Sequence, residues 1–480
     1  MRLLEVTIQT RKYSNPIYVL IPQFLTRTAK QIPRLWVFSK TCILIFMSSI
    51  SICWLRRDLR LHDNAALYHA LRSGQPVLPL FIFDREILDR LEDRYDRRVE
   101  FIYHHILRLQ EELTAMGSSM LVRYGTPTEV FNELLGEYEV SDVFTNRDYE
   151  AYAHDRDTAI SGQLREHGIS FQTFKDQVIF ETDEVMSGGG TPYTVFTPYS
   201  RRWKQTLTDF QLKSYPTEKY FANFHKTAPL PIPTLEEMNF QSTESVFPAS
   251  NVSENLLRGY AERRNFPAVE GSSRQSVHLR FGTISVRDLS RQARAQNETF
   301  LNELIWRDFY FQILHHFPRV GRGRAFRPEY ERINWRNNEE EFRAWCEGRT
   351  GYPIVDAGMR QMNETGWMHN RVRMIAASFM IKHLLIDWRW GEAYFAKKLI
   401  DYDLAANNGG WQWAAGSGCD AAPYFRVFNP TLQTQKFDPN LDYVKRWVPD
   451  LASLDYPRPI VPHEFARERA LKVYKETLQK

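Results

Sequence analysis

The sequence has few cysteines, no long apolar run and almost no excess charge of either sign. Its four cysteines form no CxxC pair, which disfavours both a disulfide framework and a zinc site. They are Cys42, Cys53, Cys346 and Cys419. The apolar run at residues 42–46 is too short to span a bilayer. We therefore expect no metal and no membrane association, and a reducing cytoplasm as the location.

Charge and composition exclude little else. The 62 basic and 58 acidic residues give a net charge of +4, which does not by itself indicate a nucleic-acid partner. A content of 43% hydrophobic and 25% charged residues is typical of globular proteins. The length of 480 residues favours more than one domain, and no internal repeat is visible.

Residues 1–46 differ from the rest of the chain. They contain seven lysines and arginines but a single acid, Glu5, and show no alternation of strands and helices. A basic segment poor in acids is typical of an organelle transit peptide. The simpler interpretation is an incorrectly assigned start, with synthesis beginning at Met47. In both cases we expect an extension that is disordered and lies outside the fold.

From residue 49 the sequence alternates between strand and helix patterns. Short apolar runs predict five strands, at 50–55, 76–84, 119–125, 140–146 and 169–174. Helical spacing lies between them, at 63–73 with Asp63 as N-cap, and at 95–116, 127–136 and 151–167. Strands separated by helices predict a parallel, Rossmann-like sheet, which binds ligands at the carboxyl ends of its strands. No GxGxxG follows the first strand, so a dinucleotide site of that type is disfavoured.

The pattern changes twice towards the C-terminus. Residues 176–254 contain GGG at 188–190 and LPIPT at 230–234, which predict an irregular connector with short helices. Residues 255–470 predict a larger all-α domain, with helices at 297–316, 338–346, 353–365, 367–386 and 389–400. The predicted domains are therefore an α/β domain at 49–175, the connector, and this helical domain.

The segment 401–429 carries the strongest functional signal. Small residues crowd it, and they allow a backbone to approach a flat ligand or another helix closely. Trp411 and Trp413 stand among them, beside Asp401, Asp403 and the Asn407–Asn408 pair. Nine of the twelve tryptophans fall between Trp306 and Trp447, in the same half of the chain. Both an aromatic cofactor and a close helix–helix contact fit this pattern.

Two helical motifs combine polar and aromatic groups. In NELIWRDFY (302–310), Glu303 and Trp306 share a face and suit a flat base with hydrogen-bonding groups, although an ion pair with Arg307 is an alternative. In GWMHNRVRM (366–374), Asn370 and Met374 share a face, and Arg371 can reach a phosphate. Asp401 and Asp403 offer partners that bury Arg373 as an ion pair.

Two further segments have a possible role in binding phosphate. EGSSRQS (270–276) is a hydroxyl-rich turn that either cradles a diphosphate or simply caps a helix. The loop 319–328 carries four arginines spaced by glycines, and it either follows a phosphate backbone or is an exposed basic loop.

Together these motifs resemble the photolyase/cryptochrome family. The resemblance covers residues 49–450 and rests on WLRRDLRLHDNAAL (54–67), VFTPYSRRW (195–203), RNFPAVEGSSR (264–274), the two helical motifs and the segment 404–430. The chain is most similar to the bacterial class I branch that acts on cyclobutane pyrimidine dimers. The family implies an N-terminal α/β antenna domain and a helical domain that holds FAD in a U shape.

The resemblance assigns roles to individual residues. The implied cofactor residues are Tyr260, Ser272, Ser273, Arg274, Gln275, Ser276, Phe300, Arg373, Asp401, Tyr402, Asp403 and Asn407, the last beside flavin N5. The implied electron relay is Trp411, Trp388 and Trp335. The implied lesion pocket is Glu303, Trp306, Asn370, Arg371, Met374 and Trp413, with Arg426 on a DNA phosphate. Glu303 and Asn407 are also the implied catalytic groups, on the dimer and the flavin respectively.

The family implies a carbon–carbon lyase in which photoexcited FADH⁻ passes an electron to a flipped-out dimer in UV-damaged DNA. We expect a monomeric, cytoplasmic bacterial enzyme that associates with the nucleoid when bound to DNA. Tyr152 and Ala153 replace the Asn-Glu pair of folate-binding relatives, so the antenna is a deazaflavin, another flavin or absent. Asn370 and Met374 replace the histidines of the (6-4) branch. The alternatives are a cryptochrome-type photoreceptor without repair activity and a flavin enzyme without a role for light.

Overall fold

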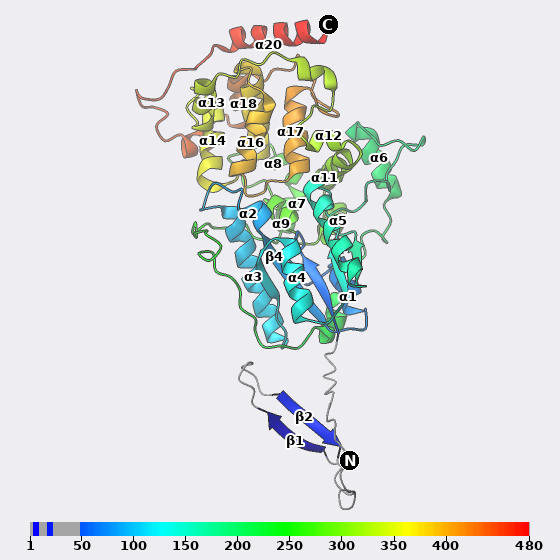
Figure 1. Cartoon of the computed structure of the whole chain (residues 1–480). Coiled ribbons are helices and arrows are strands. Elements are labelled where there is room, and N and C mark those ends of the chain that lie inside the picture. The colour runs from blue at the N-terminus through cyan, green and yellow to red at the C-terminus, as the bar shows by residue number, and fades with distance from the viewer. Residues whose placement is uncertain (1–2, 9–16, 23–48, 480) are drawn as a thin grey trace, which may run out of the picture. The chain divides into compact units, whose positions relative to one another are not determined.

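The computed structural model describes residues 3–8, 17–22 and 49–479, which form two separate units. The first unit contains strands β1 (Leu3–Ile8) and β2 (Ile17–Pro22), which pair in antiparallel register (Figure 1). The expectation that residues 1–46 form a disordered extension stays a prediction, although these two stretches are strands. Both are rich in β-branched and other apolar residues, a local signal that the basic composition concealed. The remainder of residues 1–48 lies outside the described residues.

The second unit begins with the predicted parallel sheet. Its strands lie within two residues of the predicted limits: β3 (Ile50–Leu55), β4 (Val77–Asp84), β5 (Leu121–Gly125), β6 (Val140–Asn146) and β7 (Ser170–Phe174). The spatial order β5-β4-β3-β6-β7 confirms a doubly wound, Rossmann-like sheet. The direction of winding reverses between β3 and β6. The carboxyl ends of these two strands therefore frame the crevice where such sheets usually bind ligands.

Helices pack around this sheet. They are α1 (Ala65–Leu71), α2 (Arg85–Leu88), α3 (Arg97–Ala115), α4 (Pro127–Glu137) and α5 (Ala151–Glu166). The prediction of Asp63 as the N-cap of the first helix is wrong. Asn64 is the cap, and its side chain accepts a hydrogen bond from Leu67 N at 3.1 Å. Asp63 has a φ of 47° and turns its carboxylate towards the helical part of the chain instead.

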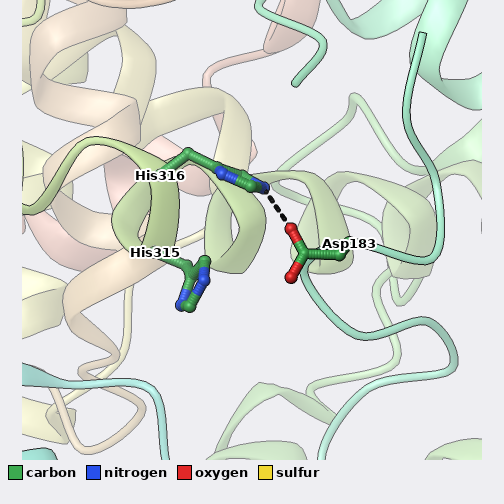
Figure 2. A group of neighbouring side chains, drawn as sticks. All are labelled: Asp183, His315 and His316. Atoms are coloured by element: carbon green, nitrogen blue, oxygen red, sulfur yellow. Dashed lines mark ion pairs between the residues drawn. The ribbon is translucent and has the colours of Figure 1, made fainter. Parts of the chain in front are cut away.

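The connector packs against both parts of the unit. It includes α6 (Phe196–Thr206) and the 3₁₀ helix η2 (Thr217–Asn223). Its side chains Phe224, Met238 and Phe240 are buried in the same hydrophobic cluster as strands β3 and β4. Near its start, the Thr182 carbonyl accepts a hydrogen bond from His316 Nε2 at 3.0 Å. Figure 2 shows Asp183 beside the same histidine, at 3.5 Å.

The helical portion lies at one end of the sheet (Figure 1). Its first helices are α7 (Glu254–Arg258), α8 (Tyr260–Arg263), α9 (Ser276–Phe281), α10 (Val286–Gln296), α11 (Glu298–His316) and α12 (Pro318–Gly321). The rest are η3 (Pro328–Arg332), α13 (Glu339–Cys346), α14 (Pro353–Thr365), α15 (Asn370–Ser378), η4 (Phe379–His383), α16 (Trp388–Lys398), α17 (Leu404–Ala415), α18 (Pro430–Phe437), α19 (Asp442–Trp447) and α20 (His463–Leu478). None of the helices in the described ranges is both long enough and apolar enough to cross a bilayer.

One predicted helix is interrupted. The sequence predicts a continuous helix over 367–386, but α15 begins only at Asn370 because His369 is its N-cap and accepts a hydrogen bond from Arg371 N. Gly366 ends the preceding helix α14 in the left-handed conformation, at φ 71°. After Ser378 the chain forms the π-helical turn η4 and then a left-handed Leu385, at φ 54°. Side-chain spacing alone shows neither change in the backbone.

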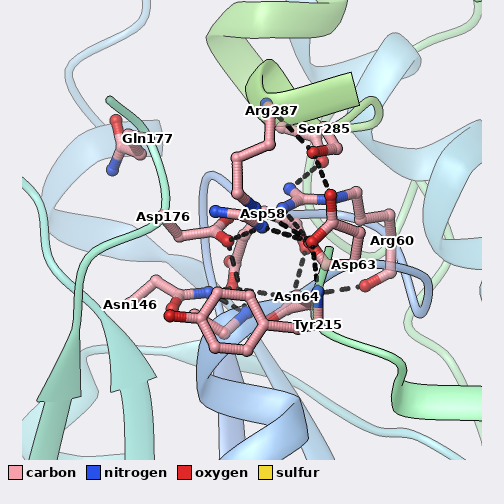
Figure 3. A network of polar contacts seen from close by, with 12 residues as sticks. Asp58, Arg60, Asp63, Asn64, Asn146, Asp176, Gln177, Tyr215, Ser285 and Arg287 are labelled. Atoms are coloured by element: carbon pink, nitrogen blue, oxygen red, sulfur yellow. Dashed lines mark hydrogen bonds and ion pairs between the residues drawn. The ribbon is translucent and has the colours of Figure 1, made fainter. Parts of the chain in front are cut away.

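A closed charge cluster joins the sheet to the helical portion (Figure 3). We define it as Asp58, Arg60, Asp63, Asn64, Asn146, Asp176, Ser285 and Arg287, all of which are buried. Asp176 lies between two arginines, with Arg60 Nη2 at 2.7 Å and Arg287 Nη2 at 2.8 Å. Asn146, at the end of β6, donates to Asp58 at 2.6 Å. The crevice between β3 and β6 is therefore filled by the protein's own polar side chains.

Candidate active site

Helix α11 presents the predicted carboxylate and indole. The helix begins after Asn297, whose side chain accepts from Phe300 N at 3.1 Å. Glu303 pairs with Arg264, which lies in the turn after α8, so the alternative pairing with Arg307 is not formed. Burial raises the pKa of Glu303, and the nearby Arg264 charge opposes part of that rise. Sequence spacing missed this partner because it lies 39 residues away.

The indole of Trp306 is stacked on a ring that the sequence analysis did not assign. Phe196, the first residue of α6, lies with its ring centroid 3.6 Å from that of Trp306, and the two planes differ by 3°. Tyr310, one turn further along α11, lies at 5.5 Å with planes 28° apart. The segment 195–203 contributed to the family resemblance, but nothing in its spacing pointed to this contact.

Helix α15 lies close to α11 through the turn after α8. Arg371 donates from Nη2 to Asn265 Oδ1 at 2.7 Å, and Asn265 directly follows the partner of Glu303. The guanidinium of Arg371 also lies over the Phe437 ring at 4.4 Å. Asn370 is exposed, and Met374 lies one turn further along the same face of α15. The structure therefore links Arg371 to Glu303 through the turn after α8.

The predicted ion pair between Arg373 and Asp401 is confirmed. Arg373 Nη2 lies 2.9 and 3.1 Å from the two Asp401 oxygens, and Arg373 Nε donates to the Met368 carbonyl at 2.7 Å. Asp401 also accepts a hydrogen bond from Ser276 Oγ at 2.5 Å. One buried carboxylate thus joins the predicted phosphate turn, α15 and the start of the 401–429 segment.

The turn 272–276 has the features of a binding turn more than of a helix cap. No side chain caps the N-terminus of α9, which the capping alternative requires. Arg274 has a left-handed φ of 52°, and its guanidinium lies over the Trp367 ring at 4.8 Å. Gln275 is buried, and its Oε1 has no hydrogen-bond partner among the described residues. An open acceptor beside two serine hydroxyls suits a polar ligand.

A hollow lies next to this turn. Its wall includes Ser272, Arg274, Trp367, His369 and Trp447. His369 Nε2 and Trp447 Nε1 are buried, and neither has a hydrogen-bond partner within the described ranges. Burial, followed by the charges of nearby arginines, lowers the pKa of His369 to about 4, so the ring is neutral at physiological pH.

The aromatic groups near the turn pack on one another. Tyr260 meets Phe300 edge to face, with centroids 4.9 Å apart, and the Arg264 guanidinium lies 5.3 Å from the Tyr260 centroid. Burial raises the pKa of Tyr260, and the charge of Glu303 adds to the rise, so its hydroxyl stays protonated. These contacts place Tyr260 beside the Glu303 pair.

Helix α17 is held at its start by charge. Asp403 is its N-cap, accepting from Ala405 N at 3.1 Å, and it also pairs with Arg57 at 2.5 Å and Arg280 at 3.6 Å. These partners already satisfy the charge of Asp403. Its role at the cofactor, which the family resemblance implies, stays a prediction. Burial raises the pKa of the neighbouring Tyr402 hydroxyl.

Asn407 is oriented by α16. Its Nδ2 donates to the Glu392 carbonyl at 3.1 Å and to Glu392 Oε1 at 3.0 Å. This arrangement fixes the amide and presents its Oδ1 as an acceptor. A methyl group placed on Gly410 meets no described atom within 4 Å outside its own helix, so space is open beside α17.

The three predicted relay tryptophans belong to one hydrophobic cluster. Trp411 and Trp388 are each 2% exposed, and the partly buried Trp335 packs against the same cluster. A Cβ on Gly391 would lie 2.1 Å from the Trp411 ring, so only glycine fits there. The series therefore runs from buried to partly exposed, as a path to the surface requires.

Hydrogen bonds hold the outer part of this series in place. Arg336 N donates to the Leu385 carbonyl at 2.8 Å, and Asp387 N donates to Asn337 Oδ1 at 2.9 Å. These bonds tie the chain after Trp335 to the chain before Trp388.

The segment 404–430 ends in a basic and aromatic surface. Trp413 is partly buried, and the exposed Arg426 lies 6.0 Å from its centroid and 5.3 Å from that of Phe428. Burial and the charges of Arg264 and Arg426 lower the pKa of Arg371. Such a set suits DNA phosphates.

Asp183, His315 and His316 have metal-binding atoms within 4.8 Å of one another (Figure 2). His316 Nε2 donates to the Thr182 carbonyl at 3.0 Å, which leaves only its Nδ1 as a metal-binding nitrogen. We assign no metal to this group.

The residues present fit FAD. The family arrangement needs hydroxyls and donors for a diphosphate, small residues beside a flat ring and an acceptor near flavin N5. The Ser272 and Ser273 hydroxyls, the open His369 Nε2, the space beside Gly410 and the fixed Asn407 amide match these needs. The individual roles assigned to the predicted site residues nevertheless stay predictions.

Comparisons with known proteins support the same conclusion. Residues 51–219 match the family model described as DNA photolyase, and residues 300–455 match the FAD binding domain of DNA photolyase. A deoxyribodipyrimidine photo-lyase from Escherichia coli strain K12 is 39% identical over 88% of this chain and 98% of its own length.

Two solved structures are similar throughout. A bacterial class III photolyase from Agrobacterium tumefaciens has a TM-score of 0.80 and 33% identity, covering 92% of this chain and all of its own. An archaeal photolyase from Sulfolobus tokodaii, solved with two FAD molecules, has a TM-score of 0.74 and 34% identity, covering 89% of this chain and 99% of its own. The chain belongs to the DNA photolyase family.

Proposed function

We propose that the protein is a light-dependent lyase that splits cyclobutane pyrimidine dimers in DNA, with FAD as its cofactor. The observation that carries this proposal is the convergence of α11 and α15. Arg264 binds Glu303 and the adjacent Asn265 binds Arg371, so a carboxylate and a basic group are held by neighbouring residues, and Trp306 shares a face of α11 with the carboxylate. The curated relatives named deoxyribodipyrimidine photo-lyase support the same activity.

The chain's residues suit a dimer that has left the duplex. A linked pyrimidine pair stacks and pairs poorly, so extruding it costs less than extruding an intact base. Trp306 and Trp413 offer ring surface, and stacking contributes roughly 1–3 kcal/mol per base. Glu303 accepts hydrogen bonds from pyrimidine N–H groups, while Arg371 and Arg426 neutralise backbone phosphates.

The cofactor residues act by positioning. When bound and reduced, FAD supplies the light-driven electron that opens the dimer's cyclobutane ring and then receives the electron back, so no net redox change occurs. Ser272, Ser273 and Arg274 would hold its phosphates, and Arg373 and Asp401 would line its ring. Asn407 would accept a hydrogen bond at N5, because Glu392 already occupies its amide nitrogen.

The second chromophore is part of the proposal only in outline. Tyr152 donates a hydrogen bond from its hydroxyl to Asp84 at 2.5 Å. A tyrosine ring fixed by this bond therefore stands where folate-binding relatives carry the Asn-Glu pair. Another flavin is a supported alternative, because the Sulfolobus tokodaii relative contains two FAD molecules. We further infer a monomer that works in the bacterial cytoplasm and at the nucleoid on UV-damaged DNA.

Repair can be separated from photoreception by experiment. We expect the purified, reduced protein to restore thymine-dimer DNA under blue light, with the number of dimers measured before and after illumination. Unchanged dimers would refute repair and favour the photoreceptor alternative.

The relay prediction needs its own variant. Trp411→Phe removes a ring that is 2% exposed and should slow photoreduction of oxidised FAD at least tenfold. The same variant, reduced chemically beforehand, should repair at the wild-type rate, because the relay only regenerates the reduced cofactor. Wild-type photoreduction in the variant would remove Trp411 from the relay.

A further inference from the structure

Helix α11 carries a stripe of polar side chains that holds the connector. Asp308, Gln312 and His316 are spaced by four residues and so lie on one face of the helix. Each forms hydrogen bonds with the segment between β7 and α6 or with α6 itself. The contacts are Asp308 Oδ2 with Ile179 N and Phe180 N (3.2 Å each) and Trp203 Nε1 (3.0 Å), Gln312 Nε2 with the Tyr193 carbonyl (2.8 Å), and His316 Nε2 with the Thr182 carbonyl (3.0 Å).

This stripe fixes where Phe196 lies. The residue follows the chain held by Gln312, and its own backbone N–H donates to Asp420 Oδ2 at 3.2 Å. Its ring covers one face of Trp306 at a centroid distance of 3.6 Å with nearly parallel planes. Bonds on both sides of Phe196 thus hold its ring against the indole.

We propose that Phe196 is a positioning residue for dimer recognition: it fixes the plane of the Trp306 indole at the pocket. This inference rests on the proposed function. An indole that is stacked on one face is ordered before the substrate arrives, so binding does not have to immobilise it. Phe196 is itself partly buried and belongs to the connector, within the motif 195–203 and outside the two motifs on α11 and α15.

The test replaces Phe196 by leucine and by tyrosine. Phe196→Leu keeps an apolar side chain but removes the ring, whereas Phe196→Tyr keeps the stack. Phe210→Leu is the matched control, because Phe210 lies on the same connector and is 80% exposed. Affinities are measured in the dark for a duplex with one thymine dimer and for the same duplex undamaged. FAD content and repair per absorbed photon at saturating DNA are measured on the same preparations.

We expect Phe196→Leu to weaken dimer binding about twofold to tenfold, the range of an aromatic pair. Affinity for undamaged DNA, FAD content and repair per photon at saturation should stay at wild-type values, since the residue acts only through Trp306. Phe196→Tyr and Phe210→Leu should both bind the dimer as the wild type does.

Unchanged dimer affinity in Phe196→Leu would overturn the inference. So would an equal loss on damaged and undamaged DNA, or a loss of FAD, because each indicates a general structural role. These outcomes are distinct from failure of the proposed function, in which the wild type itself would leave dimers unrepaired.

Discussion

The closed charge cluster and the candidate active site are both rich in buried polar groups, but they differ in how completely those groups are paired. In the cluster, every carboxylate oxygen of Asp58, Asp63 and Asp176 has at least one donor (Figure 3). Of its defined members, Arg60 alone has a buried side-chain atom, Nε, without a partner among the described residues. In the candidate site, several buried atoms have none among the described residues. They are Gln275 Oε1, His369 Nε2, Arg371 Nε and Trp447 Nε1.

The difference shows which polar groups stabilise the fold and which are available to a ligand. Burying an unpaired polar atom costs free energy, so a protein retains such atoms where a bound group pairs them. The cluster occupies the sheet crevice that binds ligands in other doubly wound proteins. Its pairing explains why this crevice holds the two portions of the fold together, while the four open atoms named above lie near the turn 272–276 and α15.

The largest expected effect comes from opening the closed cluster. Asp176→Ala leaves Arg60 and Arg287 facing each other without their shared carboxylate. Removing one partner of a buried ion pair costs about 3–5 kcal/mol. We expect a loss of this size in the free energy of unfolding, measured by urea denaturation.

The control for this variant breaks an exposed pair. Asp209→Ala removes the partner of Arg294, and these side chains are 96% and 47% exposed. Solvent screening limits that loss to about 0–1 kcal/mol. Similar losses in the two variants would show that the cluster is no more important to stability than a surface pair.

We expect a smaller effect at the candidate active site, and we expect it on repair and not on stability. Glu303→Ala should lower repair per absorbed photon about tenfold, because hydrogen bonds to a charged group contribute about 1.5 kcal/mol or more. The Glu303 side chain is 31% exposed, so the free energy of unfolding should change by less than about 1 kcal/mol. Repair is measured by dimer counts under illumination, with FAD content as a check of the fold.

Glu298→Ala on the same helix is the matched control. Glu298 pairs with Lys204 at the surface and is 74% exposed, so repair should stay at the wild-type level. A large stability loss in Glu303→Ala without loss of repair would show that Glu303 stabilises the fold, as the closed charge cluster does, and does not act in repair.

Sequence patterns predicted the helices and strands better than the contacts that individual residues make. The strands and most helices followed from apolar periodicity, because burial of one face repeats along each element. The left-handed Gly366 and the π-helical turn after Ser378 leave no trace in that periodicity. Asp63 was predicted as the cap because capping residues occur side by side there, and only the backbone geometry distinguishes it from Asn64.

The candidate active site shows more clearly that sequence patterns reveal elements but not contacts between distant segments. Charge offered Arg373 two partners, Asp401 and Asp403, and the structure forms the ion pair with Asp401. Glu303 was given the alternative partner Arg307, four residues along its helix, whereas its partner Arg264 comes from another element. Phe196 was missed for the same reason. Contacts between segments far apart in sequence depend on the packing of the whole fold.

Asp308 tests a case between the two regions, and its expected effect depends on pH. Its Oδ2 accepts three hydrogen bonds, but its buried Oδ1 has no partner among the described residues. Burial raises the pKa of this carboxyl from 3.8 to about 6, and the Trp203 hydrogen bond and the Arg307 charge offset only part of the rise. Between pH 4 and 6 the folded protein therefore keeps a proton that the unfolded chain has released.

Because the folded state binds more protons in this window, the contribution of Asp308 to stability falls as pH rises, by about 1.4 kcal/mol per pH unit. Asp308→Asn removes the titration and supplies an N–H at the open oxygen's position. Urea denaturation at pH 4.5, 5.5 and 7 should show the variant gaining on the wild type up to pH 6 and no further change above it. Other carboxyls titrate alike in both proteins and cancel in the difference. A difference independent of pH would mean that the three hydrogen bonds already stabilise the charged form, which would place Asp308 with the closed cluster.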